Sequence, residues 1–155
     1  MTAFATWCQQ SAIAEAIRSR PWPYPAIETF HIAGMVLVFG TILILNLRVF
    51  GLILRSEPVS QIAHDLTPLT FIGLGVQLVS GSLMFVTSAM KFTENALFGI
   101  KIGLVIVAVA YHFAVHRKAA IARDTPTDRL RLSAAVSFVL WAGVVLTGLD
   151  IGVLS

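Results

Sequence analysis

The sequence predicts an all-α membrane protein, a bundle of four transmembrane helices preceded by a short interfacial amphipathic helix. Of its 155 residues, 57% are hydrophobic and only 12% are charged, which is not the balance of a soluble globular domain. Four apolar segments are each long enough for the ~20 residues that a helix needs to cross ~30 Å of hydrocarbon. These segments are continuously apolar rather than alternating, which favours helices over a β-barrel.

Residues 1–25 form the first expected unit, an interfacial helix followed by a proline-rich turn. Apolar side chains such as Phe4, Trp7 and Ile13 interleave with polar ones, which is typical of a helix lying in the headgroup region. Three prolines between residues 21 and 25 remove backbone donors and restrict their neighbours. This stretch is therefore expected to be a stiff, non-helical turn.

Residues 26–155 form the second unit, a single transmembrane domain. The expected spans are 26–54, 68–90, 95–116 and 130–153. Pro68 suits the first turn of the second span, with Asp65 or Thr67 as the cap before it. The run 124–128 is expected to break the chain before the fourth span.

Charges near the ends of the spans predict the orientation. Seven basic residues follow spans one and three: Arg48, Arg55, Arg117, Lys118, Arg123, Arg129 and Arg131. Four lie on the other side: Arg18, Arg20, Lys91 and Lys101. Because cytoplasmic loops carry the excess of positive charge, we expect a bacterial inner-membrane protein with both termini in the periplasm. The basic residues are spread along the chain, so no nucleic-acid partner is expected.

Four ionisable residues are expected to form a polar pocket toward the outer face: Glu28, His31, Lys101 and Asp150. Charged groups within a span are costly in free energy and usually face the bundle interior. Glu28 and His31 are neighbours on one helix face, and Asp150 is a natural partner for Lys101. The set is interpreted either as structural ion pairs or as a site for a proton, an ion, a quinone headgroup or the propionates of a cofactor.

The four histidines are the candidate ligands of a metal or of haem b. A b-type haem in a membrane bundle commonly takes two axial imidazoles from different helices at similar depth. His64 with His112 or His116 meets this requirement, whereas His31 and His112 are expected to be more than ~15 Å apart at 1.5 Å per residue. His112 is the favoured ligand because it lies inside its span. His64 and His116 are also explained as polar residues at the membrane boundary.

Small residues occur in every span, including the pair Gly99 and Gly103. In lipid, such residues allow helix backbones to approach closely. Close packing inside one bundle is the main interpretation, and self-association through Gly99 and Gly103 is the second. The expected assembly is a homo-oligomer or a larger membrane complex.

Several motifs resemble an uncharacterised family of small bacterial inner-membrane proteins with four helices. They are Glu28-x-x-His31-x-x-Gly34, Asn46-Leu47-Arg48, Gly81-Ser82-Leu83-Met84-Phe85, Phe98-x-x-Lys101 and Trp141. The resemblance covers nearly the whole chain after Trp22 and implies the fold and location, but no activity. Asn46 stands where that family usually has Asp, which argues against an essential carboxylate there. A looser similarity to membrane b-type cytochromes depends only on histidines near helix ends.

Three functions remain open at this point. The leading one is a b-type haem protein that passes electrons within a larger respiratory or oxidative assembly, with a quinone or another redox partner. The second is a small oligomeric carrier or proton-coupled channel that uses the polar pocket, and the third is an accessory subunit that only packs against partners. The sequence contains no phosphate loop, nucleophile elbow or zinc motif, so a stand-alone enzyme is not expected.

Overall fold

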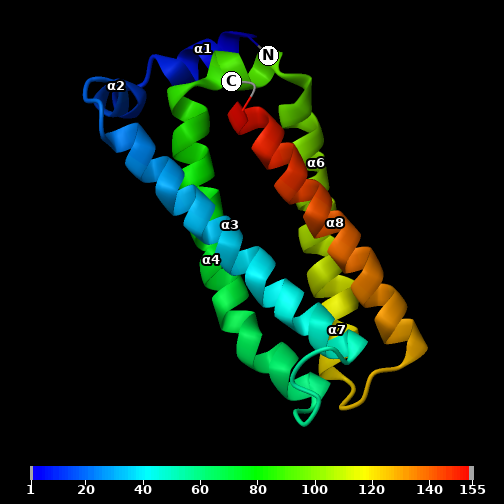
Figure 1. The fold of residues 1–155 in the computed structure, drawn as a ribbon. Coiled ribbons are helices and arrows are strands. Elements are labelled where there is room, and N and C mark those ends of the chain that lie inside the picture. Colours follow the sequence, from blue (N-terminus) through cyan, green and yellow to red (C-terminus); the bar gives the residue numbers. More distant parts are fainter. Residues whose placement is uncertain (1, 154–155) are drawn as a thin grey trace.

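The computed structural model describes the backbone of residues 2–153 and the side chains of residues 3–148, and it is a bundle of four long helices (Figure 1). The long helices are α3 (Pro23–Phe50), α4 (Val59–Thr87), α6 (Ala96–Tyr111) and α8 (Asp128–Val153). With the continuation of α6, all four are long and apolar enough to cross a membrane. No strand occurs in the part that the structure describes, so the predicted all-α, four-helix architecture is confirmed.

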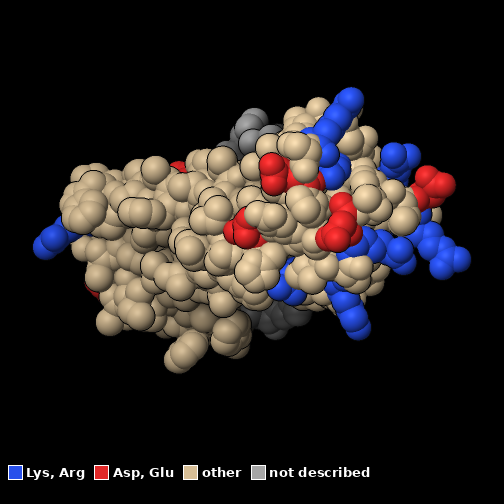
Figure 2. Space-filling view, turned by 90° about the horizontal axis from the view of Figure 1, so that it is seen from below, with Lys and Arg blue, Asp and Glu red and all other residues tan. Residues whose placement is uncertain are grey.

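Short helices mark the two ends of the bundle. Three of them lie at one end: α1 (Thr2–Gln9), α2 (Ala12–Arg18) and α5 (Ala89–Glu94). We call this the α5 end, and both ends of the described chain lie there (Figure 1). At the opposite end, the α7 end, the π-helix η1 (His112–His116) leads from α6 into α7 (Arg117–Ile121). Basic side chains gather at the α7 end, with acidic ones among them (Figure 2).

The N-terminal segment differs from the expectation in two ways. Instead of one amphipathic helix there are two, because the chain breaks at Ser11, whose hydroxyl caps α2 by accepting from the backbone of Ala14 at 3.3 Å. The expected non-helical turn is also wrong, since α3 begins at Pro23 and includes Pro25. Proline is tolerated in the first helical turn because the backbone donors of that turn have no partner within the helix.

The start of the second span is also earlier than expected. α4 begins at Val59 and continues through Pro68, so Asp65 and Thr67 do not cap it. Thr67 instead lies inside the helix, where its hydroxyl accepts a 2.8 Å hydrogen bond from the side chain of Arg117. The expected break before the fourth span is confirmed, since α8 begins at Asp128.

Large apolar side chains cover the outside of the bundle. Leu78 is 73% exposed, Val139 68% and Phe30 65%. A surface of this kind is not stable in water, and it is consistent with contact with a lipid bilayer.

The closest contact between long helices is the one between α3 and α4. A methyl group added at Gly73 would lie 2.7 Å from Val38 Cγ2, and one added at Gly34 would lie 3.0 Å from Val76 Cγ1. These glycines therefore allow the close approach that was expected inside one bundle. By contrast, methyl groups at Gly99 and Gly103 would meet no described atom within 4 Å, so that pair takes no part in packing among the described residues.

Candidate functional site

Besides the buried, hydrogen-bonded pair Thr41 and Thr70, the polar side chains inside the bundle include two separate groups that contain histidine. The first, the His31 centre, lies toward the α5 end and consists of His31, Gln77, Ser80 and Lys101. The second, the His112 centre, lies toward the α7 end and consists of Asn46, His112, His116, Ser133 and Ser137. Among the histidines, His31, His112 and His116 are thus held in the interior, each by a different set of neighbours.

In the His31 centre, hydrogen bonds between α3 and α4 fix the imidazole. His31 Nδ1 lies 2.9 Å from Ser80 Oγ, and the Ser80 hydroxyl itself donates to the carbonyl of Val76. Because that hydroxyl has only one hydrogen, Ser80 Oγ must accept from His31, and Nδ1 carries the proton. Nε2 of the neutral ring therefore keeps a lone pair for another partner. Gln77 adds a 2.7 Å bond to the backbone carbonyl of His31.

Two glycines make room for the side chains of this centre. A methyl group at Gly81 on α4 would lie 3.1 Å from the His31 ring, and one at Gly148 on α8 would lie 3.4 Å from Lys101 Nζ. The positive charge of Lys101, on α6, lies near enough to act on His31. Side chains from α3, α4 and α6 and a glycine of α8 thus converge at one level.

One member of the expected polar pocket, Glu28, is not brought into this centre. Glu28 is exposed, and its charge acts on Tyr24 rather than on the interior. The side chain of Asp150 lies outside the described side chains, so its predicted pairing with Lys101 stays a prediction.

The His112 centre lies between two apolar clusters of the core. One cluster, toward the middle of the bundle, contains Ile42, Ala108 and Trp141. The other, toward the α7 end, includes Leu45, Val49, Ala120 and Ala134. The two histidines and Ser137 lie along their helices between these clusters, and Asn46 lies on α3 next to Leu45 of the second cluster. They therefore form one polar layer in an otherwise apolar interior.

A single π-helical turn carries both histidines of this layer. His112 is 3% exposed and His116 0%, and the centroids of their rings are 5.9 Å apart. His116 Nδ1 lies 3.2 Å from the hydroxyl of Ser133, which also accepts from the Tyr111 hydroxyl at 3.1 Å. π-Helical turns inside α-helices are rare and are frequently found at functional sites.

Several buried polar atoms at this level have no hydrogen-bond partner in the described structure. They are His112 Nδ1, His116 Nε2, Ser137 Oγ, Trp141 Nε1 and both amide atoms of Asn46. Most buried polar groups in proteins are paired, and each unpaired one costs about 1–3 kcal/mol. A concentration of unpaired donors and acceptors at one depth is therefore typical of a place where a further group binds.

A closely packed apolar layer separates the two centres. It contains the α3–α4 contact at Gly34 and Gly73 and the cluster around Val38 and Trp141. Lys101 and His112 are eleven residues apart on one continuous helix, which corresponds to about 16 Å. The described residues therefore provide no continuous polar path from one centre to the other.

Two arginines near the His112 centre are held without a carboxylate partner among the described residues. Arg48 is buried and donates to the carbonyl of Glu57 at 2.7 Å, and Arg117 donates to Thr67. The charge of Arg117 acts on His112. The α7 side of this centre is thus positively charged.

His64 does not join the other histidines. Its side chain is 81% exposed and lies 3.5 Å from the carboxylate of Asp65. The suggested axial pair of His64 with His112 or His116 is therefore not brought together. Within the described part of the chain, no three His, Cys, Asp or Glu side chains form a metal-binding group.

The uncharged polar residues of the two centres could not be identified as site residues from the sequence. Ser80 and Ser133 bond to the imidazoles and Gln77 bonds to the backbone carbonyl of His31, but serine in a span commonly bonds to the carbonyl four residues earlier in its own helix. Only the recurrence of Ser133 and Ser137 at a helical interval could have indicated a polar face.

Comparison with known proteins identifies a family but no characterised relative. Residues 23–154 match the model of a family of unknown function, DUF6644. No match was found among curated proteins or among solved structures.

Proposed function

The chain belongs to the DUF6644 family, and we propose that it is a membrane-embedded electron carrier that holds a b-type haem at the His112 centre. The observation that carries this proposal is the pair of buried imidazoles in which His112 Nδ1 and His116 Nε2 lack a hydrogen-bond partner among the described residues. In a bilayer no bulk water can form hydrogen bonds with these atoms. A bound group that uses them therefore removes the free-energy cost of leaving them unpaired.

The surroundings of the His112 centre suit a haem. His112 is the preferred axial ligand, and the apolar clusters on either side offer surfaces for a macrocycle. His112 and His116 come from one face of one helix, so they cannot both ligate one iron from opposite sides. Arg48 and Arg117 provide cations for the propionates. When bound, the haem supplies one-electron transfer.

The separation of the two centres favours electron transfer over ion transport. Proton transfer requires groups within hydrogen-bond reach of one another, about 2.6–3.2 Å between heavy atoms. The apolar layer at Gly34, Gly73 and Trp141 interrupts any such chain of groups. Electrons need no continuous polar path, so this layer weighs against the channel and not against the carrier.

The proposed location is a bacterial inner membrane, with the α7 end in the cytoplasm and both termini in the periplasm. The gathering of basic side chains at the α7 end supports this orientation (Figure 2). The carrier works as a subunit of a larger respiratory or oxidative assembly, in which other chains supply and remove the electrons.

Self-association through α6 is part of the proposal. Gly99 and Gly103 have open space in front of them, which leaves their backbone available to a second copy. Gly103→Leu is expected to convert an oligomer into a monomer in chemical cross-linking within membranes. An unchanged cross-linking pattern would exclude this contact.

The haem is tested by the absorption spectrum of detergent-purified protein with dithionite added. We expect a sharp Soret band that shifts on reduction in the wild-type protein. His112→Ala should lose most of the haem per chain because the iron loses its ligand. His64→Ala is the matched control, because its imidazole is exposed, and it should retain the spectrum.

Two results would overturn this assignment. One is a colourless protein from cells with ample haem, which would favour an accessory subunit. The other is a His112→Ala variant that keeps the wild-type spectrum while folding normally.

A further inference from the structure

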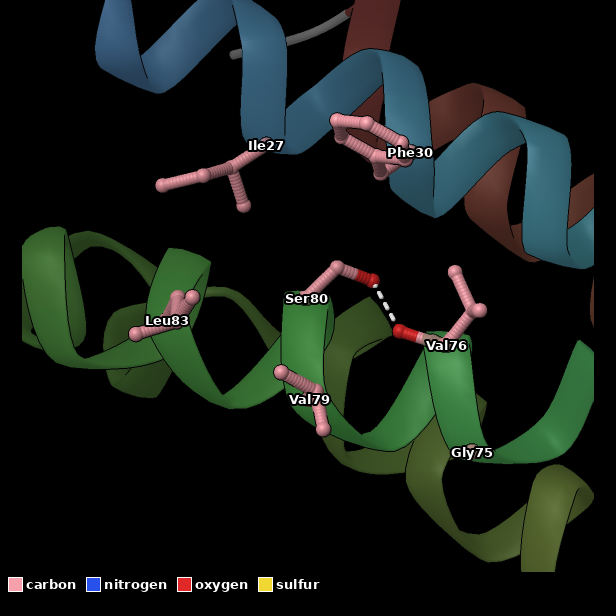
Figure 3. A pocket seen from close by; sticks show the side chains of 7 residues that line it. All are labelled: Ile27, Phe30, Gly75, Val76, Val79, Ser80 and Leu83. Carbon is pink, nitrogen blue, oxygen red and sulfur yellow. Dashed lines mark hydrogen bonds between the residues drawn. The ribbon is translucent and has the colours of Figure 1, made fainter. Parts of the chain in front are cut away.

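A groove opens on the lipid-facing side of the bundle, between α3 and α4 near the α5 end. Its volume is about 420 Å³, and its lining consists of Ile27, Phe30, Gly75, Val76, Val79, Ser80 and Leu83 (Figure 3). Phe30 and Val79 are largely exposed, so the groove is reached from the hydrocarbon. A ligand in it must therefore be soluble in lipid.

Ser80 connects this groove to the His31 centre. Its side chain lines the groove, while its hydroxyl accepts the hydrogen bond from His31 Nδ1. His31 lies directly behind it, and the charge of Lys101 acts on His31. His31 Nε2 can accept a hydrogen bond, and the Lys101 ammonium can donate three.

We propose that the groove and the His31 centre together bind a lipid-soluble quinone. The apolar tail lies in the groove, a carbonyl of the quinone form accepts from Lys101, and a hydroxyl of the quinol form donates to His31 Nε2. The role of the quinone as the electron partner of the haem depends on the function proposed above. The binding of the quinone to the groove and the His31 centre does not.

Several features favour a quinone over a phospholipid as the occupant. Lys101 lies five residues after the start of α6, about 7.5 Å into the span, which is deep for a charged phosphate. Phe30 presents an exposed aromatic ring at the groove, where a planar ring can stack. The centre offers both a donor, Lys101, and an acceptor, His31 Nε2, which match the two redox forms of a quinone, whereas a phosphate needs donors only.

Gly75 is a suitable position for a substitution that fills the groove. A Cβ added there meets nothing within 4 Å, so Gly75→Leu is expected to place its side chain in the groove without a clash at the helix backbone. Gly40→Leu is the matched control, because Gly40 on α3 also has open space in front of it and lies outside the groove. Both changes remove a helical glycine, so neither is expected to weaken its helix.

The experiment is photolabelling of the full chain in phosphatidylcholine nanodiscs with azido-decylubiquinone, competed by decylubiquinone. We expect saturable labelling of the groove segments of α3 and α4. Gly75→Leu should abolish it, and Gly40→Leu should leave it unchanged. Lys101→Met should weaken binding roughly tenfold through loss of a charged hydrogen bond, whereas Lys118→Met at the α7 end should not.

Labelling that is not competed, or that persists in Gly75→Leu, overturns the inference. So does native mass spectrometry in which a phospholipid stays bound and quinone does not displace it. A protein without haem that still binds the quinone overturns only the proposed electron carrier. A haem-containing protein that takes no label overturns only the quinone site.

Discussion

Among single residues, Asn46 is the one whose unpaired side chain is expected to affect the stability of the interior most. Its amide is 1% exposed, and neither of its polar atoms has a partner in the described structure. A buried amide of this kind lowers stability unless something binds to it. An unpaired amide buried in the last turns of α3 therefore indicates a place where a further group binds.

We predict that Asn46→Leu raises the stability of the haem-free protein while lowering the haem retained per chain. Removing both unpaired atoms should add about 1–3 kcal/mol to the free energy of unfolding. The measurement is thermal unfolding in detergent together with haem content. Thr41→Val on the same helix is the control, since Thr41 is paired with Thr70 at 2.9 Å and its loss should destabilise. A lower unfolding temperature for Asn46→Leu would show that the amide of Asn46 already has hydrogen-bond partners in the haem-free protein.

How much of the site could be predicted depends on residue type. Histidine and lysine inside an apolar span stand out, and the structure places Lys101 half-buried and His112 buried. Ser80 and Ser133 do not stand out, because the hydroxyl of a serine can donate a hydrogen bond to a backbone carbonyl of its own helix. The exposure of Glu28 depends on the rotation of α3 about its own axis in the bundle. The spacing of residues along the chain does not determine that rotation.

At the scale of helices, the contact between α3 and α4 holds the His31 centre together. His31 and Ser80 approach within hydrogen-bond distance because Gly34 and Gly73 bring the two backbones close. Helices in lipid gain no hydrophobic free energy from packing, so such close contacts carry much of their association.

Gly73→Ala is predicted to destabilise the bundle by about 1–3 kcal/mol, because the added methyl group overlaps Val38. Gly75→Ala, two residues away, faces open space and should be neutral or stabilise by up to ~1 kcal/mol through helix propensity. Unfolding of both variants by increasing SDS in mixed micelles compares them directly. Equal effects would contradict the close contact.

The existence and order of the long helices were predictable, but their ends were not. Continuous apolar runs locate the part of each helix within hydrocarbon, whereas α4 begins nine residues before the expected Pro68, in polar sequence. Proline inside a membrane helix is tolerated because neighbouring groups satisfy the backbone. The short α5 and the π-helical turn at His112 leave no periodic signal of their own.

At the scale of the whole molecule, two polar centres lie in opposite halves of one bundle with an apolar layer between them. In a bundle that spans a membrane, such an arrangement corresponds to one polar centre toward each face. It also requires that hydrocarbon surround the four helices, because their outward side chains, such as Leu78, are apolar along most of their length.

The crossing of the membrane is tested most directly by the accessibility of single cysteines to an impermeant maleimide in a Cys8→Ala background. Cysteines replace exposed residues at three depths: Trp22 at the α5 end, Leu78 in the middle of α4, and Lys118 at the α7 end. We predict that position 22 reacts in intact cells, position 118 reacts only after the membrane is opened, and position 78 reacts only in denaturant. Reaction of positions 22 and 118 from the same side, or of position 78 in intact cells, would contradict the four-span bundle.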